Sequence, residues 1–168
     1  MREYYRDWSG RDAAMLCYTS APLEADATIA GHPVVSLHLT SDQRDAALYV
    51  YLEEVEADGV CRYVTEGMLR ALHRKEAPCP EWHRTSWPFR SFARRDVAPL
   101  VPGEPALLRF ALLPVAWTFH RGSRLRLAIA GADADHFGQV PHGRPPLLRI
   151  LSGGATASMV ELPWEERA

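Results

Sequence analysis

The chain has 168 residues, of which 47% are hydrophobic and 24% charged, and its formal net charge is −2. This length and composition predict a single soluble domain over residues 1–168 and exclude disordered and collagen-like classes. The near balance of charge gives no electrostatic attraction for nucleic acid or anionic lipid, so neither is expected as a partner.

The cysteines and the hydropathy bear on the cellular compartment. Cys17, Cys61 and Cys79 cannot all pair, and no two of them have Cys-x-x-Cys spacing. No apolar run approaches the ~20 residues needed to cross a bilayer. The start, Met1–Trp8, has no apolar run behind its charges. We therefore expect reduced thiols, no membrane span, no signal peptide and a cytoplasmic location.

Alternation of apolar and polar residues with a period of two dominates the chain. In chain order it occupies residues 14–18, 35–39, 48–55, 61–73, 108–112, 125–129, 147–151 and 159–162. Such alternation buries one face of an antiparallel sheet and exposes the other to water. In the segment Leu48–Val55 this alternation places Tyr49 and Tyr51 on the solvent-exposed face. Helical spacing over a dozen residues is not convincing anywhere.

Turn residues separate these segments. Asp58-Gly59 lies between two of them and predicts a hairpin. Gly67 interrupts its segment and predicts a bulge or a close approach of another backbone. Roughly eight to ten strands with one-sided apolar faces predict an all-β fold, an antiparallel β-sandwich or jelly roll.

Residues 75–105 do not show the alternation of apolar and polar residues. This segment is rich in proline and carries four large aromatic residues, Trp82, Trp87, Phe89 and Phe92. Proline is kept out of central strands, and a connection this long usually packs as an ordered crossover or serves a function. Its aromatic side chains either cover an open end of the sandwich or meet a ligand or partner.

Motifs of known catalytic machinery are absent. The sequence has no G-x-S-x-G nucleophile turn, no phosphate-binding loop, no dinucleotide fingerprint and no H-E-x-x-H zinc motif. No catalytic residue and no cofactor is therefore predicted. Cys17 and Cys61 fall within strand patterns, where a cysteine is usually a small buried hydrophobe rather than a nucleophile.

An acidic and imidazole cluster follows the segment 125–129. Asp133 and Asp135 alternate, so along a strand they would present two oxygens to Ca²⁺ or another hard cation, with His136 beside them. They come after Gly131, however, where the strand pattern stops and Asp side chains commonly bond the local backbone in turns. The turn role is the favoured interpretation, and a metal site is the alternative.

Four segments follow one another in an order and spacing that resemble a known family. They are LCYTSAPLEADATIAGHPVVSLHLTSD (16–42), ALYVYLEEVEADGVCRYVTEGMLRALHR (47–74), LVPGEPALLRFALLPVAWTFHRGSRLRLAIAGAD (100–133) and SMVELPW (158–164). From about Trp8 to Trp164 the chain resembles the C-terminal domain of X-Pro dipeptidyl-peptidases and cocaine-esterase-like acyl hydrolases, the CocE/NonD family. The resemblance implies a galactose-binding-like jelly roll. The family's Ser-Asp-His triad lies in a separate α/β-hydrolase domain, so no catalytic residue carries over.

The resemblance implies a non-catalytic accessory domain of a serine hydrolase that acts on ester or X-Pro peptide bonds. Such a domain would buttress its partner, the α/β-hydrolase domain, and help to wall the substrate pocket between them. The residues expected to face that pocket or partner are Ser41, Asp42 and Asp45 of one loop, with Trp87 and Phe89 of the segment 75–105.

Two alternatives stay open. One is a free-standing module that binds Ca²⁺, or carbohydrate stacked on Trp82, Trp87 and Trp117, although Trp117 lies in a strand pattern typical of the core. The other is a dimerisation unit, in which edge strands of two copies pair across a two-fold axis to form a homodimer.

Overall fold

Strands make up the regular structure of this protein. The computed structural model describes residues 8–165, and within them only short 3₁₀ turns accompany the strands. The strands are β1 (Leu16–Thr19), β2 (Ala27–Gly31), β3 (Val34–Ser41), β4 (Ala47–Val55), β5 (Cys61–Arg70), β6 (Ala106–Ala111), β7 (Val115–Phe119), β8 (Arg124–Ala130), β9 (Leu148–Ile150) and β10 (Met159–Glu161). The 3₁₀ turns are η1 (Arg11–Ala14), η2 (Ala71–His73), η3 (Arg94–Asp96) and η4 (Gly154–Thr156). The predicted all-β class is confirmed.

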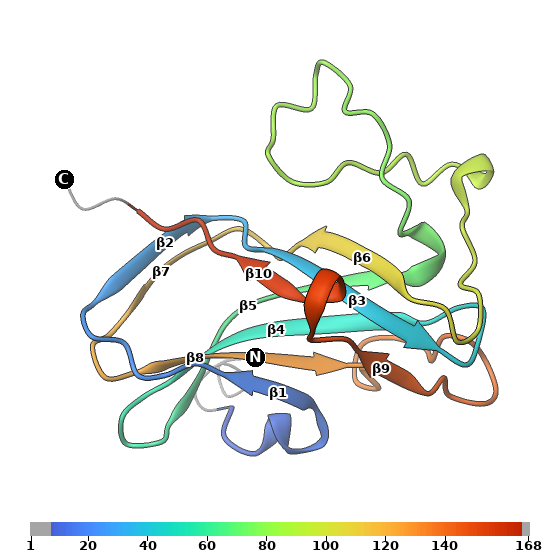
Figure 1. Ribbon diagram of the computed structural model, residues 1–168. Helices are drawn as coiled ribbons and strands as arrows, with labels where there is room; N and C mark the ends of the chain where they lie inside the picture. Colours follow the sequence, from blue (N-terminus) through green and yellow to red (C-terminus); the bar gives the residue numbers. More distant parts are fainter. Residues whose placement is uncertain (1–7, 166–168) are drawn as a thin grey trace.

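The strands form two layers and a smaller ribbon (Figure 1). The first sheet has the order β1-β8-β4-β5, and the second has the order β10-β3-β6, with β9 also paired to β3. Strands β2 and β7 make a separate two-stranded ribbon. All of these pairs are antiparallel. No helix of the described residues is long and apolar enough to cross a bilayer.

The core lies between the two sheets, where alternate residues of β3, β4 and β6 face one another. The core side chains with at most 1% exposure on these strands are Val35, Leu37, Leu39, Leu48, Val50, Leu52 and Leu108. These positions follow the period of two that the sequence shows. The hairpin predicted at Asp58-Gly59 joins β4 to β5, and Gly59 has the positive φ of 92° that such a turn needs.

The two sheets meet along the edge formed by β5 and β6. The backbone N–H of Leu113 donates to the carbonyl oxygen of Glu66 at 2.8 Å, and Thr65 Oγ1 donates to the carbonyl oxygen of Leu113 at 2.8 Å. A Cβ atom on Gly67 would lie 2.8 Å from the carbonyl oxygen of Ala111. The close backbone approach predicted at Gly67 is therefore confirmed.

The outer face of β4 is covered by other parts of the chain. The prediction that Tyr49 and Tyr51 are exposed to solvent is therefore wrong. These side chains are 6% and 4% exposed. The Trp8 ring packs on Tyr51 with centroids 5.0 Å apart, and the Phe137 ring packs on Tyr49 at 5.3 Å. The N-terminal segment and the connection between β8 and β9 cover this face, and the residue pattern of β4 alone carries no information about either segment.

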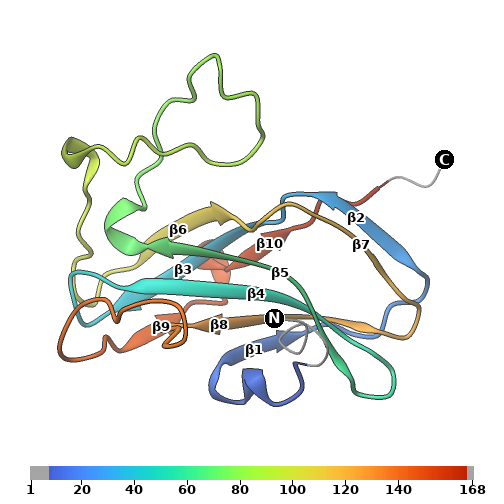
Figure 2. The same cartoon turned by 180° about the vertical axis from the view of Figure 1, so that it is seen from behind.

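Residues 75–105, called the crossover below, connect η2 at the end of β5 to β6. Figures 1 and 2 show its green to yellow chain standing away from both sheets before it returns to the sandwich. The only 3₁₀ turn described within it is η3. The absence of strand pairing agrees with the proline content of this segment.

Candidate functional site

The crossover is attached to the sandwich by the buried side chain of Arg90. Its Nε donates to the carbonyl oxygen of His73 at 2.7 Å, and Nη2 donates to the carbonyl oxygens of Arg74 and Arg109. Arg90 is 8% exposed, and this burial lowers the pKa of its guanidinium. Three carbonyl acceptors from two chain segments therefore fix this residue.

Asp96 forms bonds within the crossover, close to where the chain returns to the sandwich. Its Oδ1 lies 2.6 Å from Lys75 Nζ, and its Oδ2 accepts a 2.6 Å hydrogen bond from Ser91 Oγ. These two bonds, from Lys75 and then Ser91, lower the pKa of Asp96. Leu100 N then donates to the carbonyl oxygen of Arg44 at 2.8 Å, so the returning chain is tied to the loop after β3.

The aromatic side chains that precede Arg90 in the crossover pack mainly on one another. The His83 ring lies 5.0 Å from the Phe89 ring, 5.5 Å from the Trp87 ring and 5.9 Å from the Trp82 ring, centroid to centroid. Two ring contacts leave the crossover: the Trp87 ring lies 3.9 Å from that of His32, and the Phe92 ring lies 5.3 Å from that of His73 in η2. Trp82 remains 74% exposed.

A mostly apolar cavity of about 500 Å³ lies between the crossover and the β5–β6 edge. Its crossover side is lined by residues that include Trp87, Phe89 and Phe92, and its sheet side by residues that include Gly67 and Met68. This volume falls within the range of small-molecule and interdomain pockets. Trp87 and Phe89 are thus brought together at one concave surface.

Of the other predicted pocket-facing residues, Ser41 ends β3, and Asp42 and Asp45 lie in the loop between β3 and β4. Ser41 is buried and its Oγ accepts a hydrogen bond from Gln43 N. Asp42 accepts from Leu147 N at 2.8 Å and Arg144 Nη1 at 2.7 Å, and these contacts lower its pKa. None of the three residues lines the cavity beside Trp87 and Phe89.

Asp45 connects the same loop to the end of β5. Its Oδ2 accepts a 2.8 Å hydrogen bond from Arg70 Nε, and its Oδ1 accepts from the backbone N–H groups of Ala46 and Leu72. The carboxylate is thereby occupied by partners within the chain. The structure therefore places the two predicted groups of residues at separate positions, and the role of each remains a prediction.

The acidic and imidazole cluster forms a turn. Asp133 Oδ1 accepts from the backbone N–H of His136 at 3.2 Å and lies 3.0 Å from its Nδ1, while Tyr51 donates to Oδ2 at 3.0 Å. Asp135 is exposed. These three residues do not form a metal-ligating group among the described residues. The bonds to Asp133 support the turn interpretation.

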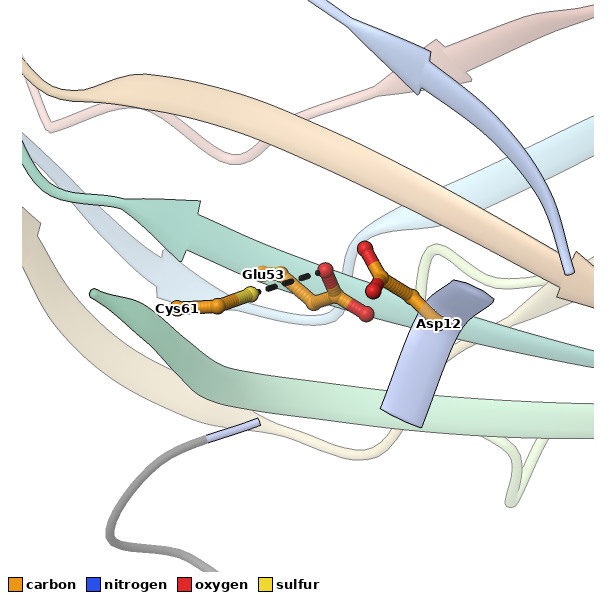
Figure 3. A group of neighbouring side chains, drawn as sticks. All are labelled: Asp12, Glu53 and Cys61. Carbon is orange, nitrogen blue, oxygen red and sulfur yellow. Dashed lines mark hydrogen bonds between the residues drawn. The ribbon is translucent and has the colours of Figure 1, made fainter. Parts of the chain in front are cut away.

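The structure reveals a buried polar cluster that the sequence interpretation missed. Glu53 on β4 and Cys61 on β5 approach Asp12 of η1, and all three are buried (Figure 3). Burial raises the pKa of Glu53 to about 6, and burial followed by the adjacent Glu53 raises that of the Cys61 thiol still more strongly. The available signal was the pair Glu53-Glu54 inside an otherwise apolar strand, since buried carboxylates are rare without partners.

Strand pairing and the N-terminal segment position this cluster. Cys61 pairs with Val55 across the hairpin, and Glu53 pairs with Tyr63 of β5 on one side and with Arg126 of β8 on the other. Trp8 N donates to the carbonyl oxygen of Cys61 at 2.8 Å, which holds the start of the described chain against β5. Arg126 on β8 forms an ion pair with Asp12 Oδ2.

Comparisons with known proteins identify relatives of this chain in sequence and in fold. The chain is 46% identical over 159 residues to proteins named as candidate serine esterases from Mycobacterium bovis and Mycobacterium tuberculosis. The match covers 95% of this chain and 25% of each relative, so the chain spans about a quarter of their length.

Solved structures share the fold at low sequence identity. A CocE/NonD family hydrolase from Staphylococcus aureus has a TM-score of 0.74 at 18% identity, over 95% of this chain and 32% of the other. An α-amino acid ester hydrolase also gives 0.74 at 18% identity, over 96% of this chain and 27% of the other. The X-Pro dipeptidyl-peptidase C-terminal non-catalytic domain family matches residues 4–165, and the chain therefore belongs to this family.

Proposed function

We propose that this chain is the accessory domain of a serine hydrolase acting on ester or X-Pro peptide bonds. In this proposal the crossover packs against an α/β-hydrolase domain of the parent protein, buttresses it and forms one wall of its substrate pocket. The exposure of the crossover aromatics carries the proposal. Family membership and the names of the relatives support the hydrolase context.

The exposed aromatics are better suited to an interface than to covering the sandwich. Trp82 is 74% exposed and Phe92 65% exposed, although both belong to the same ordered segment. Large aromatic side chains are enriched at the cores of interfaces, and exposed apolar patches on soluble domains commonly mark binding sites. A cap over the sandwich would instead bury these rings against β5 and β6.

The attachments of the crossover support the same proposal. Arg90 and the backbone N–H of Leu100 hold the crossover to the sandwich, while the Trp82 and Phe92 rings remain exposed. A segment fixed in this way presents a preformed surface, so docking requires little further ordering of the chain. The neighbouring cavity of about 500 Å³ would become part of an interdomain space when a second domain covers it.

A chimeric enzyme tests the docking role. The matching quarter of the Mycobacterium bovis relative is replaced by this chain, with Trp82→Ala, Phe92→Ala and both changes together. Hydrolysis of p-nitrophenyl esters and the thermal unfolding of the hydrolase portion are measured. Loss of an aromatic interface anchor costs about 2 kcal/mol or more, so the double variant should show weakened activity and earlier unfolding of the hydrolase portion.

Met159→Ala is the matched control, because Met159 is 55% exposed on β10, at the opposite edge of the second sheet from β6. This variant should behave as the unmodified chimera does. Equal activity and unfolding temperature for the double variant and the control would contradict docking through the crossover.

The non-catalytic role has its own test. The 168-residue chain alone should hydrolyse neither p-nitrophenyl esters nor X-Pro anilides. Turnover by a homogeneous sample that a serine-directed phosphonate abolishes would contradict an accessory role.

A further inference from the structure

Three potential metal ligands from distant parts of the sequence meet beneath η1. One donor atom each from Asp12, Glu53 and Cys61 lies within 4.8 Å of the other two, and all three residues are buried. Figure 3 shows the carboxyl group of Glu53 between the sulfur of Cys61 and the carboxyl group of Asp12. Nothing in the proposed docking role uses these side chains.

One oxygen atom in this cluster lacks a partner. Cys61 Sγ lies 3.0 Å from Glu53 Oε2, whereas Glu53 Oε1 is buried and has no hydrogen-bond partner among the described residues. The Glu53 side chain is 0% exposed, so bulk water does not solvate it. Buried polar atoms are nearly always paired with protein, water or an ion, and this oxygen therefore indicates a missing ligand.

The charges around the cluster favour a divalent cation. Without an ion the Cys61 thiol keeps its proton, so the carboxylates of Asp12 and Glu53 together with Arg126, which pairs with Asp12 Oδ2, leave one negative charge in a buried place, and this charge is costly. A divalent ion that displaces the thiol proton creates a donor set of two carboxylates and one thiolate. The ion balances the charge of minus two that this set and Arg126 then carry, and it occupies the unpaired oxygen of Glu53.

We propose that Asp12, Glu53 and Cys61 form a binding site for a divalent transition-metal ion, with Zn²⁺ as the best fit. Zn²⁺ accepts thiolate sulfur at about 2.3 Å and carboxylate oxygen at about 2.0–2.2 Å. A tetrahedral arrangement at these lengths separates the donors by about 3.4–3.7 Å. Mg²⁺ and Ca²⁺ prefer oxygen alone, so the sulfur ligand selects against them.

The remaining neighbours are compatible with such an ion. Cys17 Sγ lies 3.8 Å from Asp12 Oδ2, and the ion pair with Arg126 also uses Oδ2. Cys17 therefore places a further sulfur atom beside Asp12. As the sulfur–metal bond forms, the Cys61 thiol gives its proton to solvent, and any proton on Glu53 leaves in the same way.

Refolding gives the ion access to the buried cluster. The 168-residue chain is unfolded in denaturant with a chelator and refolded with Zn²⁺ or Co²⁺, and free metal is removed by gel filtration. Three readouts follow: metal per chain by elemental mass spectrometry, the thermal unfolding temperature, and thiolate-to-Co²⁺ charge-transfer absorption. The variants are Glu53→Gln and Cys61→Ser, with Cys79→Ser as the control because Cys79 is an exposed free cysteine of the crossover.

The wild type and Cys79→Ser should retain about one metal ion per chain and unfold at a higher temperature with Zn²⁺ than without it. Glu53→Gln and Cys61→Ser should each bind at least tenfold more weakly. A smaller effect in either folded variant overturns the proposal, as does refolded wild type without bound metal. The Co²⁺ spectrum of the wild type needs no variant, and a spectrum without thiolate charge transfer also overturns it. In those cases Glu53 is protonated instead of metal-bound, and its neutral carboxyl group explains why the fold tolerates it in a buried place.

Discussion

The indole Nε1 of Trp117 donates a 2.9 Å hydrogen bond to Oε2 of Glu54, and thereby joins β7 to β4. The other oxygen, Oε1, accepts from the backbone N–H of His120 at 2.9 Å. Glu54 is only 1% exposed, so both carboxylate oxygens are satisfied within the protein. This carboxylate fixes the β2–β7 ribbon to the end of the first sheet.

Replacing Glu54 should therefore destabilise the fold. Glu54→Ala removes the acceptor of two partly buried donors, those of Trp117 and His120, at a cost of about 1–3 kcal/mol in the free energy of unfolding. Urea unfolding followed by tryptophan fluorescence measures this loss. Glu104→Ala, at an exposed glutamate in the turn before β6, should change the stability by less than about 0.5 kcal/mol. Equal stability for the two variants would refute this role of Glu54.

The Gly67 position should tolerate no side chain. A Cβ atom there would lie 2.8 Å from the carbonyl oxygen of Ala111 and 2.9 Å from Leu112 Cα, so Gly67→Ala forces β5 and β6 apart. We expect a loss of about 1–3 kcal/mol, which calorimetry or urea unfolding would detect. Gly138→Ala is the control, because a Cβ atom at Gly138 meets nothing within 4 Å. A Gly67→Ala variant as stable as this control would contradict the close approach.

Much of the fold could be predicted because its core follows one rule. The core side chains of β3 are Val35, Leu37 and Leu39 and those of β6 are Leu108 and Phe110, and a period of two specifies these positions directly. Gly67 and the hairpin at Asp58-Gly59 could also be recognised, because glycine has specific backbone consequences.

The buried cluster could not be predicted by the same rule. Glu53 and Arg126 are partners across β4 and β8, but Asp12 reaches them only because η1 lies over the outer face of the first sheet. Periodicity describes which face of β4 a residue occupies, but it does not show whether another segment covers that face. Crossover residues Trp87 and Phe89 were recognised by composition, whereas their shared cavity required the three-dimensional path of the chain.

Arg90 should control the order of the crossover. Arg90→Ala removes the hydrogen bonds to the carbonyl oxygens of His73, Arg74 and Arg109. We expect chymotrypsin to cleave near Trp82 several-fold faster in this variant, with cleavage sites mapped by mass spectrometry, because local opening exposes the backbone to the protease. The control is Arg84→Ala, since Arg84 is an exposed arginine of the same segment. Identical cleavage rates for the two variants would show that Arg90 does not hold the crossover.

Glu66 should make stability depend on pH in a defined direction. Burial and then the charge of Asp133 raise its pKa above the usual 4.5, against a smaller lowering effect of His136. A raised pKa favours the folded state below the unfolded pKa, and this contribution is lost as pH rises through the folded pKa. The unfolding temperature of Glu66→Gln relative to wild type should therefore increase between about pH 4 and pH 7, whereas exposed Glu104→Gln should show little change. A relative unfolding temperature of Glu66→Gln that falls over this interval would reverse the sign and contradict the effect of burial.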